Sequence, residues 1–180
     1  MIFWHLGATT LAVRYVYRDP AMDLRWVWVG ALLPDLIDKP IGAVVFNDAL
    51  GAHRLFTHAI AAPVLAFFAV LVLTRRGSGI RKGWIGLVIG MLFHLVLDAA
   101  WAEPEAFLWP FFGWGFPVTD PSALWPLVRH MAAQPLVWAG EAAGLGYLAY
   151  VWWAHLPESG GWRRVLTEGT IPLPASPPAR

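Results

Sequence analysis

The sequence predicts an all-α protein, a polytopic membrane bundle of about five transmembrane helices. Composition is the first observation behind this prediction, since 58% of the 180 residues are hydrophobic and only 14% are charged. Soluble domains contain roughly 25% charged residues. The second observation is a succession of five apolar segments, most of them close to the roughly 20 residues that a helix needs to cross a bilayer. The third is tryptophan, which favours the membrane–water interface and occurs 12 times.

The apolar segments define the expected helices in chain order. The first covers about residues 2–17 and begins without the basic residues of a signal peptide, so we expect it to remain as a helix. The second covers about residues 25–46 and is interrupted by Pro34 and Pro40. Irregular backbone at membrane depth is tolerated only where protein or water surrounds it. The other three segments cover about residues 55–74, 83–101 and 135–155, and all five form one membrane domain, residues 1–156.

Basic residues are concentrated in alternate connections between these segments and after the last one. Their positions are Arg14, Arg18, Arg25, Arg75, Arg76, Arg81, Lys82, Arg163 and Arg164. Because cytoplasmic loops of membrane proteins are enriched in Lys and Arg, this distribution places the amino terminus outside and the carboxy terminus in the cytoplasm. Residues 157–180 are rich in Pro, Gly and Ser, and are expected to form a cytoplasmic tail that is partly disordered.

The composition also excludes several kinds of function. There is no cysteine, so disulfides, iron–sulfur clusters and thiolate zinc sites are excluded. A net charge of +1 without a basic stripe gives no reason to expect nucleic acid as a partner. The expected partners are the lipid bilayer and a small-molecule or lipid substrate.

Ionisable side chains occur where the surroundings should be apolar. They are His5, Asp35, Asp38, His53, His58, His94, Asp98 and Glu141. An ionisable group in hydrocarbon costs roughly 2.5–3.5 kcal/mol, so each of them needs a partner or a function. The predicted topology brings all of them toward the outer side of the membrane. We therefore expect one metal site facing that side, held by His, Asp and Glu alone.

Two pairs have the spacing of metal ligands. His94 and Asp98 are four residues apart and project from one face of a helix. Asp35 and Asp38 are three residues apart and form a carboxylate edge that can bridge two cations. Both pairs also have structural interpretations. The first could form a buried hydrogen bond, and the second could cap a helix or pair with Lys39.

The remaining predicted ligands have weaker spacing. His53 and His58 are five residues apart, which does not fit one face of a regular helix. They can converge if His53 lies in the loop before the helix; otherwise they are histidines of the membrane interface. His5 and Glu141 are included because of their depth, with an ordinary polar terminus and a hydrogen bond from a tryptophan indole as the alternatives.

The same residues carry a resemblance to a known family. His5, Leu-Leu-Pro-Asp-Leu-Ile-Asp at 32–38, His-Arg-Leu-Phe-Thr-His at 53–58 and Gly-Met-Leu-Phe-His-Leu-Val-Leu-Asp at 90–98 resemble the LexA-regulated bacterial inner-membrane family of metal-dependent hydrolases. The resemblance covers about residues 1–101. It implies hydrolysis at the bacterial inner membrane. The sequence departs from the family at Ala59, where a serine is expected. A more distant likeness, in ligand types and helical setting, is to zinc-dependent phospholipase C.

Imidazole and carboxylate ligands without thiolates are typical of a two-metal hydrolytic centre. We expect two divalent ions, zinc first, with manganese, iron or magnesium as alternatives. The substrate would be an ester or phosphoester, lipid-linked or otherwise at the membrane surface. Asp38 and Glu141 would serve in acid–base chemistry or water orientation, and Arg54 would neutralise developing charge. His130 and His155 are interpreted as interfacial residues without a chemical role.

Two other classes of function use the same residues. A metal-ion or proton transporter also needs intramembrane carboxylates and histidines. A structural membrane protein could hold a closed metal site with no free coordination position.

Overall fold

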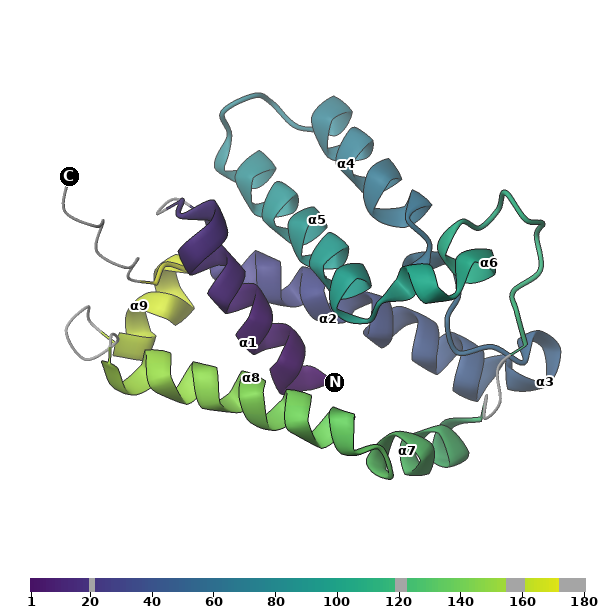
Figure 1. The fold of residues 1–180 in the computed structure, drawn as a ribbon. Helices are drawn as coiled ribbons and strands as arrows, with labels where there is room; N and C mark the ends of the chain where they lie inside the picture. The colour runs from purple at the N-terminus through teal and green to yellow at the C-terminus, as the bar shows by residue number, and fades with distance from the viewer. Residues whose placement is uncertain (20–21, 119–122, 155–160, 172–180) are drawn as a thin grey trace, which may run out of the picture.

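The computed structural model describes residues 1–19, 22–118, 123–154 and 161–171, and the described residues form helices and turns with no β-strand among them (Figure 1). The prediction of an all-α fold is confirmed. His155, together with residues 157–160 and 172–180 of the expected tail, lies outside the described residues. The five apolar segments correspond to α1 (Ile2–Ala12), α2 (Leu24–Pro40), α4 (Ala61–Leu73), α5 (Gly79–Leu97) and α8 (Pro135–Ala154).

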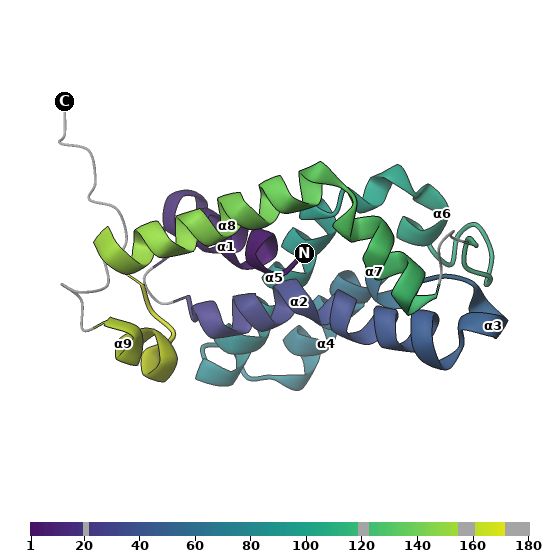
Figure 2. The same cartoon turned by 90° about the horizontal axis from the view of Figure 1, so that it is seen from below.

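The centre of the fold is the packing of α2 against α5 (Figures 1 and 2). Glycines let the two backbones approach closely. A Cβ atom at Gly30 would lie 2.0 Å from the Leu87 carbonyl oxygen, and one at Gly90 would lie 2.2 Å from the Val27 carbonyl oxygen. Small residues at such contacts are typical of helix pairs in membranes. This contact positions Asp35 and Asp38 on α2 relative to His94 on α5.

A second helix pair, α1 with α8, packs beside the first (Figure 2). Its closest approach is again between glycines, since a Cβ atom at Gly7 would lie 2.5 Å from the Gly144 Cα. α1 continues into a π-helical turn at Val13–Tyr17 and ends at Arg18, whose φ of 52° is left-handed. Helix α4 packs on α5 on the side away from α8. The core therefore lies between the α1–α8 pair and α4.

α2 continues through Pro34, although proline lacks the amide hydrogen of a regular helical bond. Asp23 caps the start of the helix, because its carboxylate accepts the Arg25 amide at 3.0 Å. After Pro40 the chain passes into a π-helical turn at residues 41–45 and the short helix α3 (Asn47–Leu50). The irregular backbone expected in this segment therefore lies after the second proline and not at the first.

Helix α4 has an apolar outer surface. Leu65, Val72 and Leu73 expose 67%, 81% and 81% of their area. A contiguous apolar surface is unfavourable in water, so this face is suited to contact with lipid. A 3-10 turn, Phe56–His58, directly precedes α4 and enters the core, where its last residue is buried.

The chain reverses after α5 at Ala99, whose φ is 49°. It then forms the short helix α6 (Pro104–Phe107), an exposed aromatic stretch and helix α7 (Leu124–Ala132), which leads into α8. α7 lies near the end of α2 that carries α3, as Figure 2 shows. Because of the reversal at Ala99, the segment after α5 lies beside the end of α5.

Part of the expected tail is ordered against the start of α2. Helix α9 (Gly161–Glu168) presents its last carbonyl oxygens to Arg25, whose Nη1 donates to Leu166 at 2.7 Å and to Thr167 at 2.9 Å. The Leu24 amide donates to the Gly169 carbonyl oxygen at 2.8 Å. Residues 161–171 are therefore packed on the membrane domain.

Among the described residues, α5 alone is long and apolar enough to cross a membrane. A helix of its 19 residues is about 28 Å long, close to the roughly 30 Å of the hydrocarbon core. α4 is apolar but has only 13 residues. The prediction of five transmembrane helices is not confirmed. π-helical turns follow α1 and α2 within the first and second apolar segments.

Candidate metal centre

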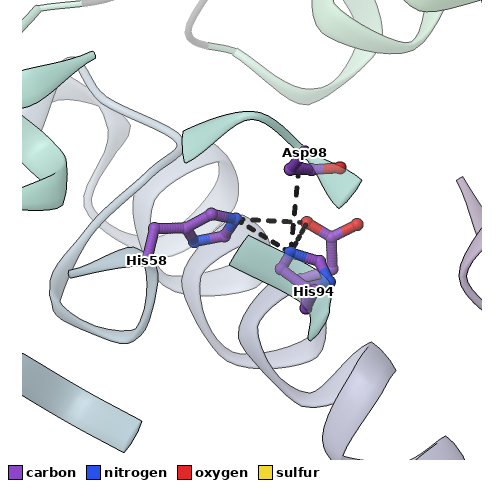
Figure 3. A group of neighbouring side chains, drawn as sticks. His58, His94 and Asp98 are labelled. Atoms are coloured by element: carbon purple, nitrogen blue, oxygen red, sulfur yellow. Dashed lines mark hydrogen bonds and ion pairs between the residues drawn. The ribbon is translucent and has the colours of Figure 1, made fainter. Parts of the chain in front are cut away.

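Four of the predicted ligands meet at one place: Asp35, His58, His94 and Asp98. Asp35 comes from α2 and His58 from the turn before α4, while His94 lies in the last turn of α5 and Asp98 directly follows it. One ligand atom from each residue lies within 4.8 Å of the other three. Figure 3 shows the side chains of His58, His94 and Asp98 directed toward one another. These four residues are called the four-residue group below.

The separations within the group fit the ligands of one ion. The Nε2 atoms of His58 and His94 are 3.3 Å apart, and they lie 3.5 and 3.7 Å from Oδ1 of Asp35. Oδ2 of Asp98 is 3.7 Å from His94 Nε2. Ligand atoms about 2.0–2.1 Å from a tetrahedral zinc ion lie about 3.4 Å from each other. Four of the six separations are therefore close to this value, and all six are within 4.8 Å, so the ligand atoms can converge on one ion after side-chain adjustment.

Asp38 orients His58 from behind. The Nδ1 atom of His58 is 2.7 Å from Oδ2 of Asp38, and both side chains are buried. The same carboxylate accepts the backbone amides of Leu55 at 2.8 Å, Thr57 at 3.3 Å and His58 at 3.1 Å. Because a carboxylate accepts, a neutral His58 ring carries its proton on Nδ1 and directs the Nε2 lone pair into the group. A carboxylate behind a histidine is the usual support of a metal-ligating imidazole.

His94 is oriented in the same way by the backbone of α2. Its Nδ1 atom is 2.7 Å from the Ala31 carbonyl oxygen, which can only accept. The Nε2 atom therefore also presents a lone pair to the group. None of the described residues donates a hydrogen bond to Oδ1 of Asp35. The group thus consists of hydrogen-bond acceptors facing one another in a buried space, which is unfavourable unless a cation lies among them.

His5 lies beside the group, on the other oxygen of Asp98. Its ring is fully buried and stacks on His94 with centroids 4.4 Å apart. The Nδ1 atom contacts the Met1 carbonyl oxygen, and Nε2 is 3.2 Å from Oδ1 of Asp98. The structure therefore places this predicted ligand in contact with Asp98 but outside the four-residue group.

Two other predicted ligands do not face the group. The carboxylate of Asp38 stands behind His58, and its oxygens accept hydrogen bonds there. Glu141 is on α8, and its side chain reaches the start of α1, where Oε2 accepts the Phe3 amide at 2.9 Å. The first amides of a helix lack partners within the helix, so a carboxylate at this position is stabilising. Because α8 packs on the outer side of α1, Glu141 reaches the end of α1 and not the group.

His53 and Arg54 lie next to the group on the side of Asp98. Burial, followed by the neighbouring Arg54 guanidinium, lowers the pKa of His53 below its ordinary value, so its ring is neutral at pH 7. Arg54 lies between two carboxylates, with Nη1 2.9 Å from Oε1 of Glu103 and Nη2 3.4 Å from Oδ2 of Asp98. His53 is thus not a member of the group, and Arg54 is in contact with one of its ligands.

Two residues outside the predicted set, Lys39 and Glu103, also contact the site. Lys39 Nζ is 2.5 Å from Oδ2 of Asp35, one helical turn away. The spacing of Asp35 and Lys39 on one helix face is visible in the sequence and is the signal for this contact. Glu103 is brought to Arg54 by the reversal of the chain after α5, for which the sequence gives no signal.

A cavity of about 460 Å³ adjoins the group. Its lining residues are Met1, Lys39, His53, Arg54, Leu97, Asp98, Ala99, Glu103, Leu127, His130 and Met131. Asp98 therefore belongs both to the four-residue group and to the cavity wall. The cavity provides room for a small molecule next to the candidate metal ligands.

Comparison with known proteins identifies the family of the chain. No solved structure matches it. The chain is similar to the uncharacterized protein YvsG of Bacillus subtilis (strain 168), with 32% identity over an alignment of 102 residues that covers 52% of this chain and 61% of that relative. The match spans less than two thirds of the relative's length. The likeness to zinc-dependent phospholipase C is not shown.

The family model described as YdjM inner membrane protein matches residues 1–158, which include the whole four-residue group. The chain therefore belongs to the YdjM inner membrane protein family, as its motifs predicted.

Proposed function

We propose that this protein is a metal-dependent hydrolase of the bacterial inner membrane that acts on an ester or phosphoester. The single observation that carries the proposal is the four-residue group, whose acceptor atoms face one another and are 3.3–3.7 Å apart where they are closest. Two imidazole nitrogens and two carboxylate oxygens suit zinc first, and manganese or iron as well. The family supports the membrane location.

The residues of the site would have three roles. Some would bind the metal ion, some orient the metal-binding side chains, and some are charged residues that line the cavity. A divalent ion held by the group would supply Lewis-acid polarisation and activation of water. Asp38 and the Ala31 carbonyl hold the two imidazoles in the tautomers that direct Nε2 inward. Asp98 connects the group to the cavity in which a substrate would lie. Arg54 presents its guanidinium to the same cavity, where it would offset negative charge that develops on an attacked ester.

The second ion and the roles of the outlying predicted residues are part of the same proposal. His5 Nε2 and Oδ1 of Asp98, 3.2 Å apart, would be able to hold a second divalent ion. Glu141 has one buried oxygen, Oε1, to which none of the described residues donates a hydrogen bond. That oxygen is available for acid–base chemistry if substrate extends toward the start of α1.

The first prediction concerns metal and turnover together. Wild-type protein, purified in an uncharged detergent, should contain divalent metal and hydrolyse ester or phosphoester substrates in a chelator-sensitive manner. Asp98→Ala removes a ligand and should lose both metal and activity. Arg54→Ala should keep its metal and lose on the order of 10²–10³ in turnover, since it removes one stabilising donor. Arg54→Lys should recover little, because an ammonium cannot form the bidentate contact.

The measurements are elemental analysis and turnover of the same preparations. Arg129→Ala is the matched control, since Arg129 is exposed on α7 and does not line the cavity. Equal loss of metal and activity in Arg54→Ala would make the arginine structural. A wild type without bound metal would contradict the proposal. Metal-dependent flux into liposomes without hydrolysis of any ester would replace it with a transporter.

A further inference from the structure

We propose that Lys39 and Arg54 form an anion-binding subsite, and that the substrate is a phosphate ester of an amphiphile and not a neutral carboxylic ester. This inference rests on the hydrolase proposed above and specifies its substrate. Lys39 comes from the end of α2 and Arg54 from the loop after α3, and both side chains line the cavity beside Asp98.

The two cations are bound to the carboxylates that would hold the metal. Lys39 contacts Asp35 at 2.5 Å, and Arg54 contacts Asp98 at 3.4 Å. In the absence of a metal ion, these carboxylates neutralise the two cations. A divalent ion on the same carboxylates would compensate their charge instead, so the metal ion and the two cations compete for one pair of carboxylates.

Metal binding therefore leaves a positive surplus in the cavity. Of the side chains that line the cavity, those of Lys39 and Arg54 are cationic, and Glu103 is the carboxylate that remains beside them, 2.9 Å from Arg54. Met1 also lines the cavity, and its amino group, 3.8 Å from Oδ2 of Asp35, is a third cation. With His53 neutral, the cations exceed the remaining carboxylate. A phosphate group would neutralise this surplus, whereas a neutral carboxylic ester would not. The guanidinium also matches phosphate oxygens in a bidentate geometry.

Part of the cavity wall is apolar. Leu97 at the end of α5 and two residues of α7, Leu127 and Met131, line it. On the outer surface of α7, Trp125 and Val128 expose 69% and 44% of their area. The cavity, at about 460 Å³, has room for a phosphate and the first part of a chain. A longer apolar chain would leave the cavity along α7 toward the membrane.

The test measures binding of three probes to the metal-loaded, full-length protein in uncharged detergent. Dodecyl phosphate carries both the phosphate and the chain, ethyl phosphate carries the phosphate alone, and dodecyl acetate carries the chain with a neutral ester. Dodecyl phosphate should bind more tightly than either of the others. Lys39→Gln and Arg54→Gln should each weaken its binding roughly ten- to hundredfold, the loss expected for one charge-assisted hydrogen bond. Arg129→Gln, outside the cavity, should bind as the wild type does.

Metal content is measured on the same samples, so that the two proposals can fail separately. Unchanged dodecyl phosphate binding in Lys39→Gln and Arg54→Gln, with metal bound, would overturn the subsite and leave the metal centre intact. Equal binding of dodecyl acetate would overturn the selectivity for phosphate. If ethyl phosphate binds as tightly as dodecyl phosphate, the anion-binding subsite is supported. The proposal that the substrate is an amphiphile would then be overturned, because a water-soluble phosphate ester would suffice. Phosphate binding of equal strength without any bound metal would overturn the competition between the metal ion and the two cations, and would contradict the hydrolase.

Discussion

At the scale of single residues, the candidate site depends on which ring nitrogen of each histidine carries the proton. Asp38 and the Ala31 carbonyl determine this for His58 and His94, through contacts of 2.7 Å in each case. Neither supporting group faces the four-residue group itself. Supports of this kind typically change metal affinity by 10–100-fold when they are removed.

The residue-scale prediction is that Asp38→Asn weakens metal binding although Asp38 is not a ligand. Asparagine keeps the shape but replaces one accepting oxygen by an NH2 group, so it cannot accept all four contacts that the carboxylate accepts. We expect the dissociation constant of the metal to rise roughly 10–100-fold. Competition with a chromogenic chelator measures it. Glu105→Gln, an exposed change on α6, is the control.

Asp38 is fully buried, so its replacement can also destabilise the fold. Thermal unfolding of the metal-free variant separates the two effects. Metal affinity equal to that of the wild type in a folded Asp38→Asn protein would show that Asp38 only closes the loop at Leu55–His58.

At the scale of elements, the contact of α2 with α5 determines where the ligands stand. His94 follows Gly90 by one helical turn, and the Ala31 carbonyl that orients it lies on the facing turn of α2. A Cβ atom at Gly90 would lie 2.2 Å from the Val27 carbonyl oxygen and 2.7 Å from the Ala31 amide nitrogen. The two helices must therefore separate before any larger residue is accommodated.

The element-scale prediction is that Gly90→Ala destabilises the protein and weakens metal binding together. Overpacking of this kind costs roughly 1–3 kcal/mol, and separation of the helices would lengthen the contact between His94 and Ala31. Gly146→Ala on α8 is the control, because a Cβ atom there meets nothing within 4 Å. That control should leave the unfolding temperature unchanged or raise it slightly, since alanine favours helix over glycine. Identical unfolding temperatures for Gly90→Ala and the wild type would refute the role of this contact.

At the scale of the whole molecule, the orientation in the membrane places the site. Among the described residues, α5 is the helix that meets the length and composition of a membrane span, and the group lies at its carboxyl end. If α5 crosses the membrane, the connection from α4 to α5 and the aromatic stretch after α6 lie on opposite sides. Because the basic residues Arg75 and Arg76 precede α5, the positive-inside rule predicts that the site lies on the outer side.

The whole-molecule prediction follows from the absence of cysteine in the sequence. Single cysteines introduced as Arg76→Cys and Trp114→Cys would each be unique, and both positions are exposed. A membrane-impermeant maleimide applied to intact cells with a permeable outer layer should label Trp114→Cys and spare Arg76→Cys. Both should react after the membrane is disrupted. Labelling of Arg76→Cys alone would reverse the orientation and move the site to the cytoplasmic side.

The sequence by itself determined the helical class, the membrane family and the four residues that form the candidate site. Composition and apolar runs determine the helical class. In lipid, a chain that forms no closed barrel can satisfy its backbone hydrogen bonds only as helices. His94 and Asp98 could be recognised because ligand pairs on one helix obey its period of 3.6 residues. Asp35 and His58 could be recognised because ionisable residues are costly in apolar segments.

Only the tertiary structure decided which ionisable residues face one another. Asp38 and Asp35 are three residues apart on α2, yet the turn Phe56–His58 covers Asp38 and turns its carboxylate into the support of His58. Glu141 has a suitable depth, but the packing of α8 on α1 directs it to the Phe3 amide. Glu103 joins Arg54 because the chain reverses at Ala99. Sequence spacing determines the direction in which side chains project from one helix. Contact between elements depends instead on how their backbones pack. Here that packing depends on glycines whose partners on the facing helix lie more than 50 residues away in the sequence.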